Sequence, residues 1–215
     1  MSRLLERLKS GEILVADGAM GTMLFRRGLK PGECPESLNL THPEILEEIA
    51  SLYLNAGADI IQTNTFGGSP LKLSNYNLEK KTGEINRNAV EAVKKVAGGK
   101  AYVSASCGPS GEMLKPYGMI EKERMYNSFL EQMESLINAG AEIICVETMT
   151  DLNEAVLAVR AAKSVSSAIP VMATMTFDKI PRGFYTVMGV SIENAAAGLS
   201  EAGADIIGSN CGHGI

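Results

Sequence analysis

Residues with reactive or hydrogen-bonding side chains follow short apolar segments at three points in the chain. Thr63 and Asn64 come after the first segment, Glu147 after the second, and Asn210 and Cys211 after the third. A carboxylate can hold a cation, and a cysteine thiolate is both a nucleophile and a metal ligand. These side chains could share one site if the three segments are strands of the same sheet.

The same short sequence motif precedes all three apolar segments. Ala-Gly-Ala followed by an acidic residue occurs at 56–59, 139–142 and 202–205, each time after a helix-like segment. Uninterrupted apolar runs such as 143–146 are typical of strands that are buried on both faces. The repeat indicates a βα unit that is used several times. In a barrel of such units the carboxyl ends of the strands face the substrate.

The strand pattern favours a barrel over the alternative, a doubly wound open sheet. An eight-stranded barrel typically needs about 250 residues, and the chain has 215. No G-x-G-x-x-G sequence opens a helix after the first strand, however. We predict an α/β, TIM (β/α)8-type barrel with about six βα units, in one domain over residues 1–215 that is incomplete at its C-terminus. The predicted strands lie at 13–16, 60–61, 101–106, 143–146, 170–177 and 206–207.

Helical spacing of apolar residues predicts the connecting elements. The predicted helices lie near the N-terminus and at 44–56, 84–96, 121–138, from 151 onward and at 191–199. A capping box is expected at Thr41, with His42 on the surface, and helix caps are expected at Asp151 and Ser191. Residues 26–40 are predicted to be a long loop over the barrel mouth, with Cys34 as a bystander.

Composition restricts the class of partner. The formal net charge is −5 and the pI is about 5.2, which argues against a nucleic-acid or anionic-membrane surface. No apolar run approaches the roughly 18 residues that span a bilayer. The four cysteines show no C-x-x-C spacing and are expected to be reduced thiols. We expect a cytoplasmic protein with a small-molecule partner.

Two carboxylates stand out by their position. Asp17 follows the first predicted strand and precedes a glycine-rich turn, so it is either a turn former or a substrate contact. Glu147 ends a strand that is expected to be buried. A bare carboxylate there is unfavourable unless it is paired or hydrogen-bonded. The amino group of a ligand is a plausible partner for Glu147.

Four motifs carry a resemblance to a known family. Residues 17–22 (Asp-Gly-Ala-Met-Gly-Thr), 62–66, 146–148 and 210–212 resemble the homocysteine S-methyltransferase family, and the match covers essentially the whole chain. The family includes the homocysteine-binding module of cobalamin-dependent methionine synthase and betaine-homocysteine methyltransferase. Residues 17–22 and 34–39 look more like the methionine-synthase branch. The resemblance implies a TIM barrel that transfers a methyl group to the thiolate of homocysteine to give methionine.

The resemblance also implies a cofactor and site residues. Zinc would be held by three cysteine thiolates, of which Cys211 is one, with the homocysteine sulfur in the fourth position. No protein residue beyond the zinc site would be catalytic. Methylcobalamin on another domain is a possible methyl donor, and cobalamin and folate modules are possible partners. The residues implied to hold the amino-acid end of homocysteine are Asp17, Gly18, Ala19, Thr63 and Glu147.

The chain departs from the family pattern at the zinc ligands. The family's other two ligands are adjacent cysteines, and the sequence contains no Cys-Cys pair. We expect residues 1–215 alone to be inactive for that reason. Cys107 is expected to be a packing residue, because free cysteines are usually buried. It is not expected to replace a missing zinc ligand, because strands three and six lie far apart around an eight-stranded ring. An open barrel exposes two sheet edges, which predicts aggregation or a homo-oligomer.

Two other functions stay open. Lys179, just past the fifth predicted strand, could form a Schiff base in a lyase or aldolase, although Asp178 and Pro181 beside it favour a solvated loop lysine. The chain could instead be a non-catalytic amino-acid-binding or assembly module that lacks a complete zinc site.

Overall fold

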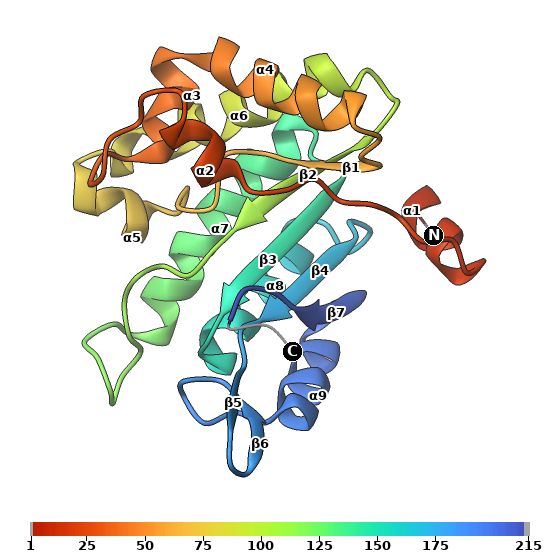
Figure 1. Ribbon diagram of the computed structural model, residues 1–215. Coiled ribbons are helices and arrows are strands. Elements are labelled where there is room, and N and C mark those ends of the chain that lie inside the picture. Colours follow the sequence, from red (N-terminus) through yellow and green to blue (C-terminus); the bar gives the residue numbers. More distant parts are fainter. Residues whose placement is uncertain (1, 213–215) are drawn as a thin grey trace.

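A computed structural model describes residues 2–212 of the chain. It contains a parallel five-stranded sheet with the strand order β1-β2-β3-β4-β7 (Figure 1). Strands that succeed one another in this sheet are also neighbours in it, as in a barrel wall, and helices connect them. The α/β fold with a partial barrel is confirmed. The strands are β1 (Ile60–Gln62), β2 (Tyr102–Cys107), β3 (Ile143–Met149), β4 (Val171–Met175) and β7 (Ile206–Ser209).

The first predicted strand is reduced to a single bridge. Ala16 pairs in parallel with Ile60, and the Asp17 N–H donates to the Ile60 carbonyl at 2.9 Å. Val15 is 57% exposed and Ile13 is 89% exposed. The prediction of a strand at 13–16 was therefore wrong in extent, because the pairing covers too few residues. It was right in place, since Ala16 lies on the outer side of β1.

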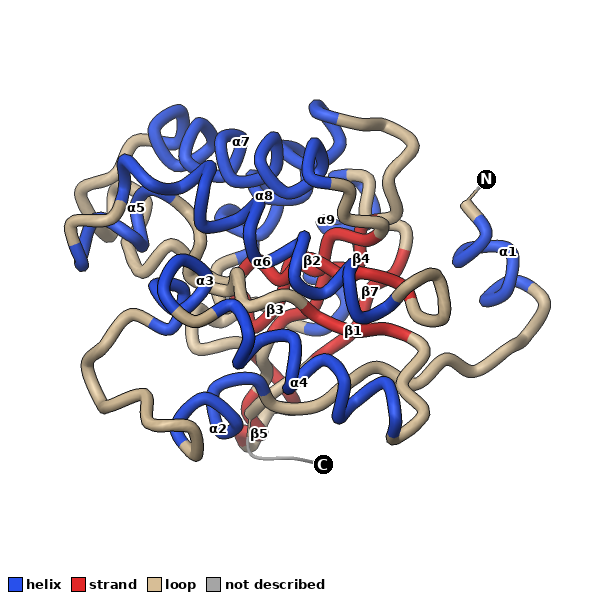
Figure 2. The backbone as a smooth tube through the Cα atoms, turned by 90° about the horizontal axis from the view of Figure 1, so that it is seen from above, coloured by secondary structure: helices blue, strands red, loops and turns tan. Residues whose placement is uncertain are grey.

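Helices cover one face of the sheet in chain order (Figures 1 and 2). Successive helices pack on one another and on the strands between them. The largest buried cluster lies at this interface and includes Phe129, Met133 and Val159, each with no exposed surface. The long helices are α4 (Pro43–Asn55), α6 (Thr82–Ala97), α7 (Lys122–Ala139), α8 (Leu152–Val165) and α9 (Ile192–Ala202).

Apart from the expected helix near the N-terminus, the shorter helices lie in segments that the sequence left as loops. The predicted loop at 26–40 contains a 3-10 turn, η1 (Pro35–Ser37), and the start of α3 (Leu38–Thr41). Cys34 in this segment is 5% exposed. The remaining short helices are α1 (Arg3–Lys9), α2 (Met20–Phe25), α5 (Pro70–Leu73), η2 (Ser74–Tyr76) and η3 (Glu79–Lys81).

The predicted helix caps are partly correct. Asp151 accepts a hydrogen bond from the Asn153 N–H, and Ser191 accepts one from the Asn194 N–H, as expected for N-caps. The capping box at Thr41 is wrong. His42 occupies the N-cap of α4 without a side-chain cap bond, because the Thr41 hydroxyl donates to the carbonyl of Ser37 in the preceding turn.

A two-stranded antiparallel hairpin follows β4. It consists of β5 (Asp178–Ile180) and β6 (Gly183–Tyr185). Lys179 therefore lies in a strand of this hairpin and not in a loop, and its side chain is exposed. The Schiff-base hypothesis gains no support from this position, because Lys179 does not line the cavity at the strand ends described below.

Within residues 2–212 the sheet has two open edges, at Ala16 and at β7. Ile207 on β7 is 42% exposed and lies in an apolar groove with Leu199 of α9. Among residues 2–212, no helix combines the length and the apolar character that crossing a bilayer requires.

Candidate functional site

A cavity of about 510 Å³ opens at the carboxyl ends of the strands. Its wall is built from the turn after Ala16 and from the residues that end β1, β2 and β3, together with the end of β7. Because parallel strands end at the same side of a sheet, residues far apart in sequence meet here. The cavity lining includes all six residues named from the family resemblance: Asp17, Gly18, Ala19, Thr63, Glu147 and Cys211.

Asp17 has one carboxylate oxygen without a partner. Its Oδ2 accepts a hydrogen bond from the backbone N–H of Gln62 at 2.8 Å. Its Oδ1 is buried and makes no hydrogen bond to any described residue. Burial, with a smaller contribution from the nearby charge of Glu147, raises the pKa of Asp17 to about 6. The turn thus holds one oxygen, and the other is left for a ligand.

Glu147 faces the same cavity from β3. The hydroxyl of Ser106 donates to its Oε1 at 2.5 Å, and the side-chain amide of Asn210 donates to its Oε2 at 3.3 Å. Burial raises the pKa of Glu147 above its ordinary value, and the hydrogen bond from Ser106 opposes this shift. Two half-buried carboxylates close enough to repel each other would both be favoured in the ionised form by a cation between them.

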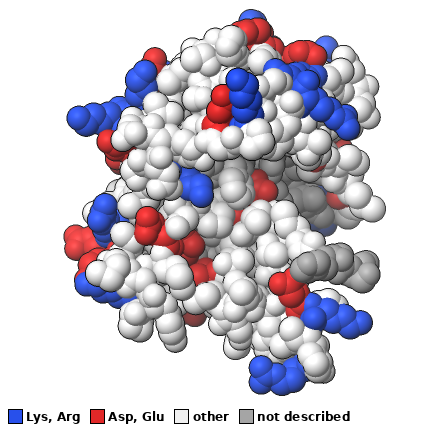
Figure 3. Space-filling model, turned by 60° about the vertical axis from the view of Figure 1, so that its left-hand side comes forward, with Lys and Arg blue, Asp and Glu red and all other residues white. Residues whose placement is uncertain are grey.

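No cationic side chain lines this cavity within residues 2–212. The face of the molecule in Figure 3 carries Lys and Arg side chains interspersed with Asp and Glu side chains, without a large patch of one sign. The carboxylates that line the cavity are those of Asp17, Glu36 and Glu147.

The turn after Asp17 offers backbone donors. Neither the Gly18 nor the Ala19 N–H donates a hydrogen bond within the described part of the chain. The Tyr53 hydroxyl donates to the Ala19 carbonyl at 3.2 Å. A Cβ atom at Gly18 would lie 3.0 Å from that hydroxyl, so glycine lets Tyr53 hold the turn. The two free N–H groups suit a carboxylate.

Thr63 and Asn64 form the wall between the two acids. Thr63 is 2% exposed, and its hydroxyl lies 2.6 Å from that of Thr65, which donates to the Ser106 carbonyl. Asn64 donates to the carbonyl of Pro35 and to the Oδ1 of Asn39. These bonds fix the end of β1 and connect it to the segment before α3.

Cys211 lies at the edge of the cavity with an exposed side chain. Its Sγ is 3.7 Å from the Thr148 hydroxyl and 3.6 Å from the Asn210 amide nitrogen. The other three cysteines, Cys34, Cys107 and Cys145, are buried free thiols. Burial raises the pKa of Cys107 well above the ordinary value, and its Sγ donates to Gln132 in the core, so the prediction that it packs is confirmed.

The donor set around Cys211 does not complete a zinc site. A catalytic zinc has three protein ligands, and no cluster of three or more His, Cys, Asp or Glu residues suited to a metal occurs within residues 2–212. Cys211 offers one thiol there, and its contacts at the cavity edge are a hydroxyl and an amide.

Other lining residues were not named as site residues from the sequence. Glu36 accepts hydrogen bonds from the Gly67 N–H and from the thiol of Cys34. Ser106 supports Glu147, and Phe66 forms part of the apolar wall. Ser106 stands near the end of the third predicted strand, so the strand-end rule could have found it. Glu36 lies in a predicted loop and carried no such signal.

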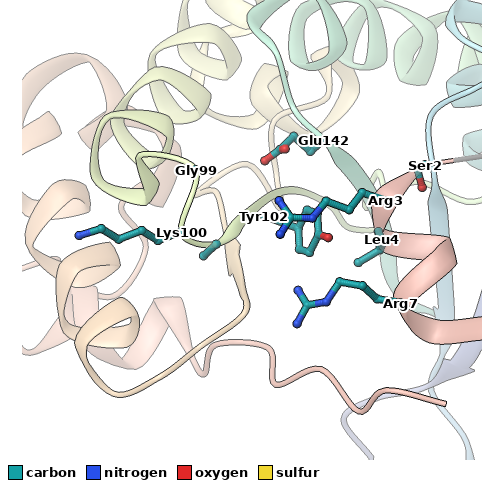
Figure 4. Close-up of a pocket in the computed structure, with 9 residues that line it drawn as sticks. Ser2, Arg3, Leu4, Arg7, Gly99, Lys100, Tyr102 and Glu142 are labelled. Atoms are coloured by element: carbon teal, nitrogen blue, oxygen red, sulfur yellow. The ribbon is translucent and has the colours of Figure 1, made fainter. Parts of the chain in front are cut away.

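A second cavity lies at the opposite, amino-terminal end of the strands. It measures about 310 Å³ and is lined by α1 and by the segment that enters β2. Arg3 and Arg7 point toward Tyr102, whereas Lys100 points away from them (Figure 4). Arg7 already pairs with Glu12 and Asp59. The basic side chains therefore do not converge on one point. Residues at this end of a barrel usually contribute to the stability of the fold and not to catalysis.

Comparison with known proteins places the chain in a family. Residues 14–215 match the model of the family described as homocysteine S-methyltransferase. The chain is 33% identical to the methionine synthase of Mycobacterium tuberculosis over 223 residues, which cover 95% of this chain and 18% of that protein. It is 33% identical to betaine–homocysteine S-methyltransferase 1 of Mus musculus over 214 residues, which cover 97% of this chain and 50% of that protein.

A solved structure supports the fold. The apo form of the homocysteine methyltransferase MmuM from Escherichia coli superposes with a TM-score of 0.73 and 21% identity, over 95% of this chain and 74% of that chain. The chain spans about a fifth of the mycobacterial methionine synthases and about half of the mouse betaine enzyme.

Proposed function

The chain belongs to the homocysteine S-methyltransferase family, and we propose that it binds homocysteine in the strand-end cavity and presents its sulfur for methylation to methionine. The observation that carries this proposal is the pair formed by the unpartnered Asp17 Oδ1 and the Glu147 carboxylate, which face one cavity without a cationic side chain. That arrangement selects a ligand with a cationic group.

The amino-acid end of homocysteine matches the polar part of the cavity. Its ammonium would lie between Asp17 and Glu147, where it would satisfy the free oxygen of Asp17 and relieve the repulsion between the two acids. Its carboxylate would accept hydrogen bonds from the N–H groups of Gly18 and Ala19, and Thr63 would close this side. Such contacts orient the substrate before any bond is made.

The sulfur end would point toward Cys211. Zinc, with Cys211 as one ligand, belongs to this proposed site, and the described residues provide no cluster that would supply a second and a third ligand. Zinc supplies such sites with a substrate thiolate at neutral pH. The part played by this chain's own residues is to bind the amino acid and to fix the direction of its sulfur.

The methyl donor is a separate part of the proposal. The two groups of curated relatives carry the names methionine synthase and betaine–homocysteine S-methyltransferase, and residues 17–22 and 34–39 favour the first. We therefore propose a methyl group delivered from a cobalamin module, with a folate module as a further partner. A cytoplasmic location is also proposed, since all four cysteines are free thiols.

A non-catalytic amino-acid-binding module is the second candidate. The observation that favours it is the single thiol at the cavity within residues 2–212. In this alternative the chain binds homocysteine but forms no methionine, whether or not zinc and a methyl donor are supplied.

Calorimetric titration with L-homocysteine under reducing conditions tests the proposal. We expect binding by the 215-residue chain and a loss of at least about tenfold in affinity in both Asp17→Asn and Glu147→Gln, because each removes a charged partner of the ammonium. Glu112→Gln, outside the cavity lining, is the matched control. Absence of binding, or equal affinity in all four proteins, would refute the proposal.

The titration is followed by an activity assay that separates the two candidates. Because residues 1–215 alone are expected to be inactive, the complete protein is used: it is incubated with zinc, homocysteine and methylcobalamin, betaine or S-methylmethionine in turn, and methionine is measured by mass spectrometry. Methionine formation favours the enzyme. Homocysteine binding without methionine under every condition favours the binding module.

A further inference from the structure

Asn210 connects three strands at the edge of the cavity. It follows β7, and its Oδ1 accepts hydrogen bonds from the Thr174 hydroxyl of β4 and from the backbone N–H of Thr148 in β3, both at 2.9 Å. β3 and β7 are not neighbours in the sheet, since β4 lies between them. The side chain of Asn210 therefore reaches across β4 to fix the end of β3.

The amide nitrogen of Asn210 faces the groups proposed to handle substrate. It donates to the Thr148 hydroxyl at 2.8 Å and lies 3.3 Å from Glu147 Oε2 and 3.6 Å from Cys211 Sγ. An amide has two N–H groups. One serves the Thr148 hydroxyl, and the carboxylate and the sulfur share the other. One side chain thus touches both the acid end and the sulfur end of the site.

The orientation of this amide is fixed by its partners. The Thr148 N–H can only donate, so it requires the oxygen of Asn210. The Glu147 carboxylate accepts, so it requires the nitrogen. Turning the amide over would place Oδ1 against a carboxylate and would leave the Thr148 N–H without an acceptor, which is unfavourable in a partly buried site.

The backbone around these contacts is strained. Thr148 has φ +59° and Cys211 has φ +58°, in the left-handed region that residues other than glycine, and β-branched residues such as threonine above all, rarely adopt. The pairing of β3 with β4 shifts register between Val146 and Met149, so Glu147 and Thr148 lie in a bulge. Bulges redirect side chains, and such strain persists only where neighbouring contacts hold it.

From these contacts we propose that Asn210 is a positioning residue that locks the Glu147 bulge and the Cys211 thiol into one arrangement. The distance between the ammonium site and the sulfur end is then set by a single side chain. This inference rests on the proposed binding of homocysteine for its affinity measurement but not for its exchange measurement.

The exchange measurement needs no ligand. Hydrogen–deuterium exchange of the Thr148 amide, observed by NMR, reports its bond to Asn210 Oδ1. In Asn210→Ala we expect this amide to exchange at least about tenfold faster, whereas core amides such as that of Val103 keep their protection. Unchanged exchange at Thr148 would overturn the proposal whether or not the chain binds homocysteine.

The affinity measurement asks whether Asn210 acts through Glu147. We expect Asn210→Ala to weaken homocysteine binding about tenfold, the size typical of one hydrogen bond to a charged group. In a Glu147→Gln background the same change should cost less than about twofold, and in an Asp17→Asn background it should still cost about tenfold. Equal losses in both backgrounds would indicate a general structural role and would overturn the proposal.

If Asn210→Ala does not fold, two milder substitutions test the same contacts. Thr174→Val removes the hydroxyl that holds the Asn210 side-chain oxygen. Thr176→Val removes a hydroxyl that donates to the backbone carbonyl of Asn210 at 3.1 Å. We expect the first to weaken homocysteine binding severalfold and to speed exchange at Thr148, with effects below about twofold for the second. Equal effects of the two would refute a role for the side chain.

Discussion

Replacing Asp17 by asparagine should stabilise the folded chain and weaken its binding of homocysteine. The pKa of Asp17 is about 6 in the folded chain, against 3.8 for an ordinary aspartate, chiefly because of burial. At about 1.36 kcal/mol per pH unit, this difference corresponds to about 3 kcal/mol. Asparagine can still accept the Gln62 N–H. Its buried amide nitrogen lacks a partner, which costs about 1 kcal/mol, so a net gain of about 2 kcal/mol is expected.

The gain should depend on pH in one direction. A carboxyl whose pKa is raised by folding favours the folded state when it is protonated. The contribution of Asp17 to the unfolding free energy of the wild type is therefore fully present below about pH 4. It falls as pH rises through about 6, because the ionised form is disfavoured in the fold. The asparagine side chain of the variant does not titrate. The difference in unfolding free energy between variant and wild type should therefore be smallest at about pH 4 and should reach its maximum by about pH 8.

Urea unfolding of both proteins at about pH 4, 6 and 8, followed by circular dichroism, measures this difference. Asp59→Asn is the control of opposite sign, because hydrogen bonds from Val15 and Arg7 lower the pKa of Asp59. That variant should be less stable than wild type at about pH 8, with the difference vanishing in acid. If Asp17→Asn were no more stable than wild type at alkaline pH, or if its advantage did not change with pH, the reasoning about Asp17 would be wrong.

Four further predictions follow from the same contacts. Homocysteine affinity should fall as pH drops below about 6, by up to about tenfold per pH unit in a calorimetric series, because Asp17 protonates; a flat profile would exclude it as an ammonium partner. Gly108→Ala should lower unfolding free energy by about 1–3 kcal/mol in urea, since a Cβ would lie 2.4 Å from the Phe66 ring, whereas Gly21→Ala, with nothing within 4 Å, should change it by less than about 1 kcal/mol. Cys211→Ser should change the affinity for norvaline, an analogue of homocysteine that lacks the sulfur, by less than about twofold. The same substitution should abolish methyl transfer by the complete protein, and retained transfer would remove Cys211 from the proposed zinc ligands. Ile207→Lys should reduce concentration-dependent self-association in sedimentation velocity, because it places a charge on the open β7 edge; unchanged association would implicate another surface.

The sequence was most informative about strands and about what ends them. The Ala-Gly-Ala-acid repeat located β1, β3 and β7, because a tight turn before an apolar run favours a parallel strand, although β7 is half-buried to exposed and not buried as expected. The same rule brought Thr63, Glu147 and Cys211 to one end of the sheet. The first strand was overestimated, since Ile13 and Val15 are apolar but have no helix over them in the described chain, so their pattern alone could not show their exposure.

Details that depend on contacts between distant segments could not be predicted. The Thr41 hydroxyl bonds to the preceding turn instead of capping α4, a choice between two nearby acceptors that local sequence leaves open. Glu36 reaches the cavity because α3 is tied to the segment after β1, where Asn39 donates to the Asn64 carbonyl. The bulge at Thr148 likewise depends on Asn210, which is 62 residues away in sequence.

The acids at the cavity are arranged for binding at the expense of stability. Asp17 and Glu147 both have raised pKa values because burial disfavours their ionised forms. Hydrogen bonds from Gln62, Ser106 and Asn210 hold them there, and one oxygen of Asp17 receives none. A site whose only role was structural would be more stable with amides at both positions. An ammonium ligand reverses that preference, since it interacts with the ionised acids alone, so homocysteine should stabilise the wild-type chain against urea more than it stabilises Asp17→Asn or Glu147→Gln.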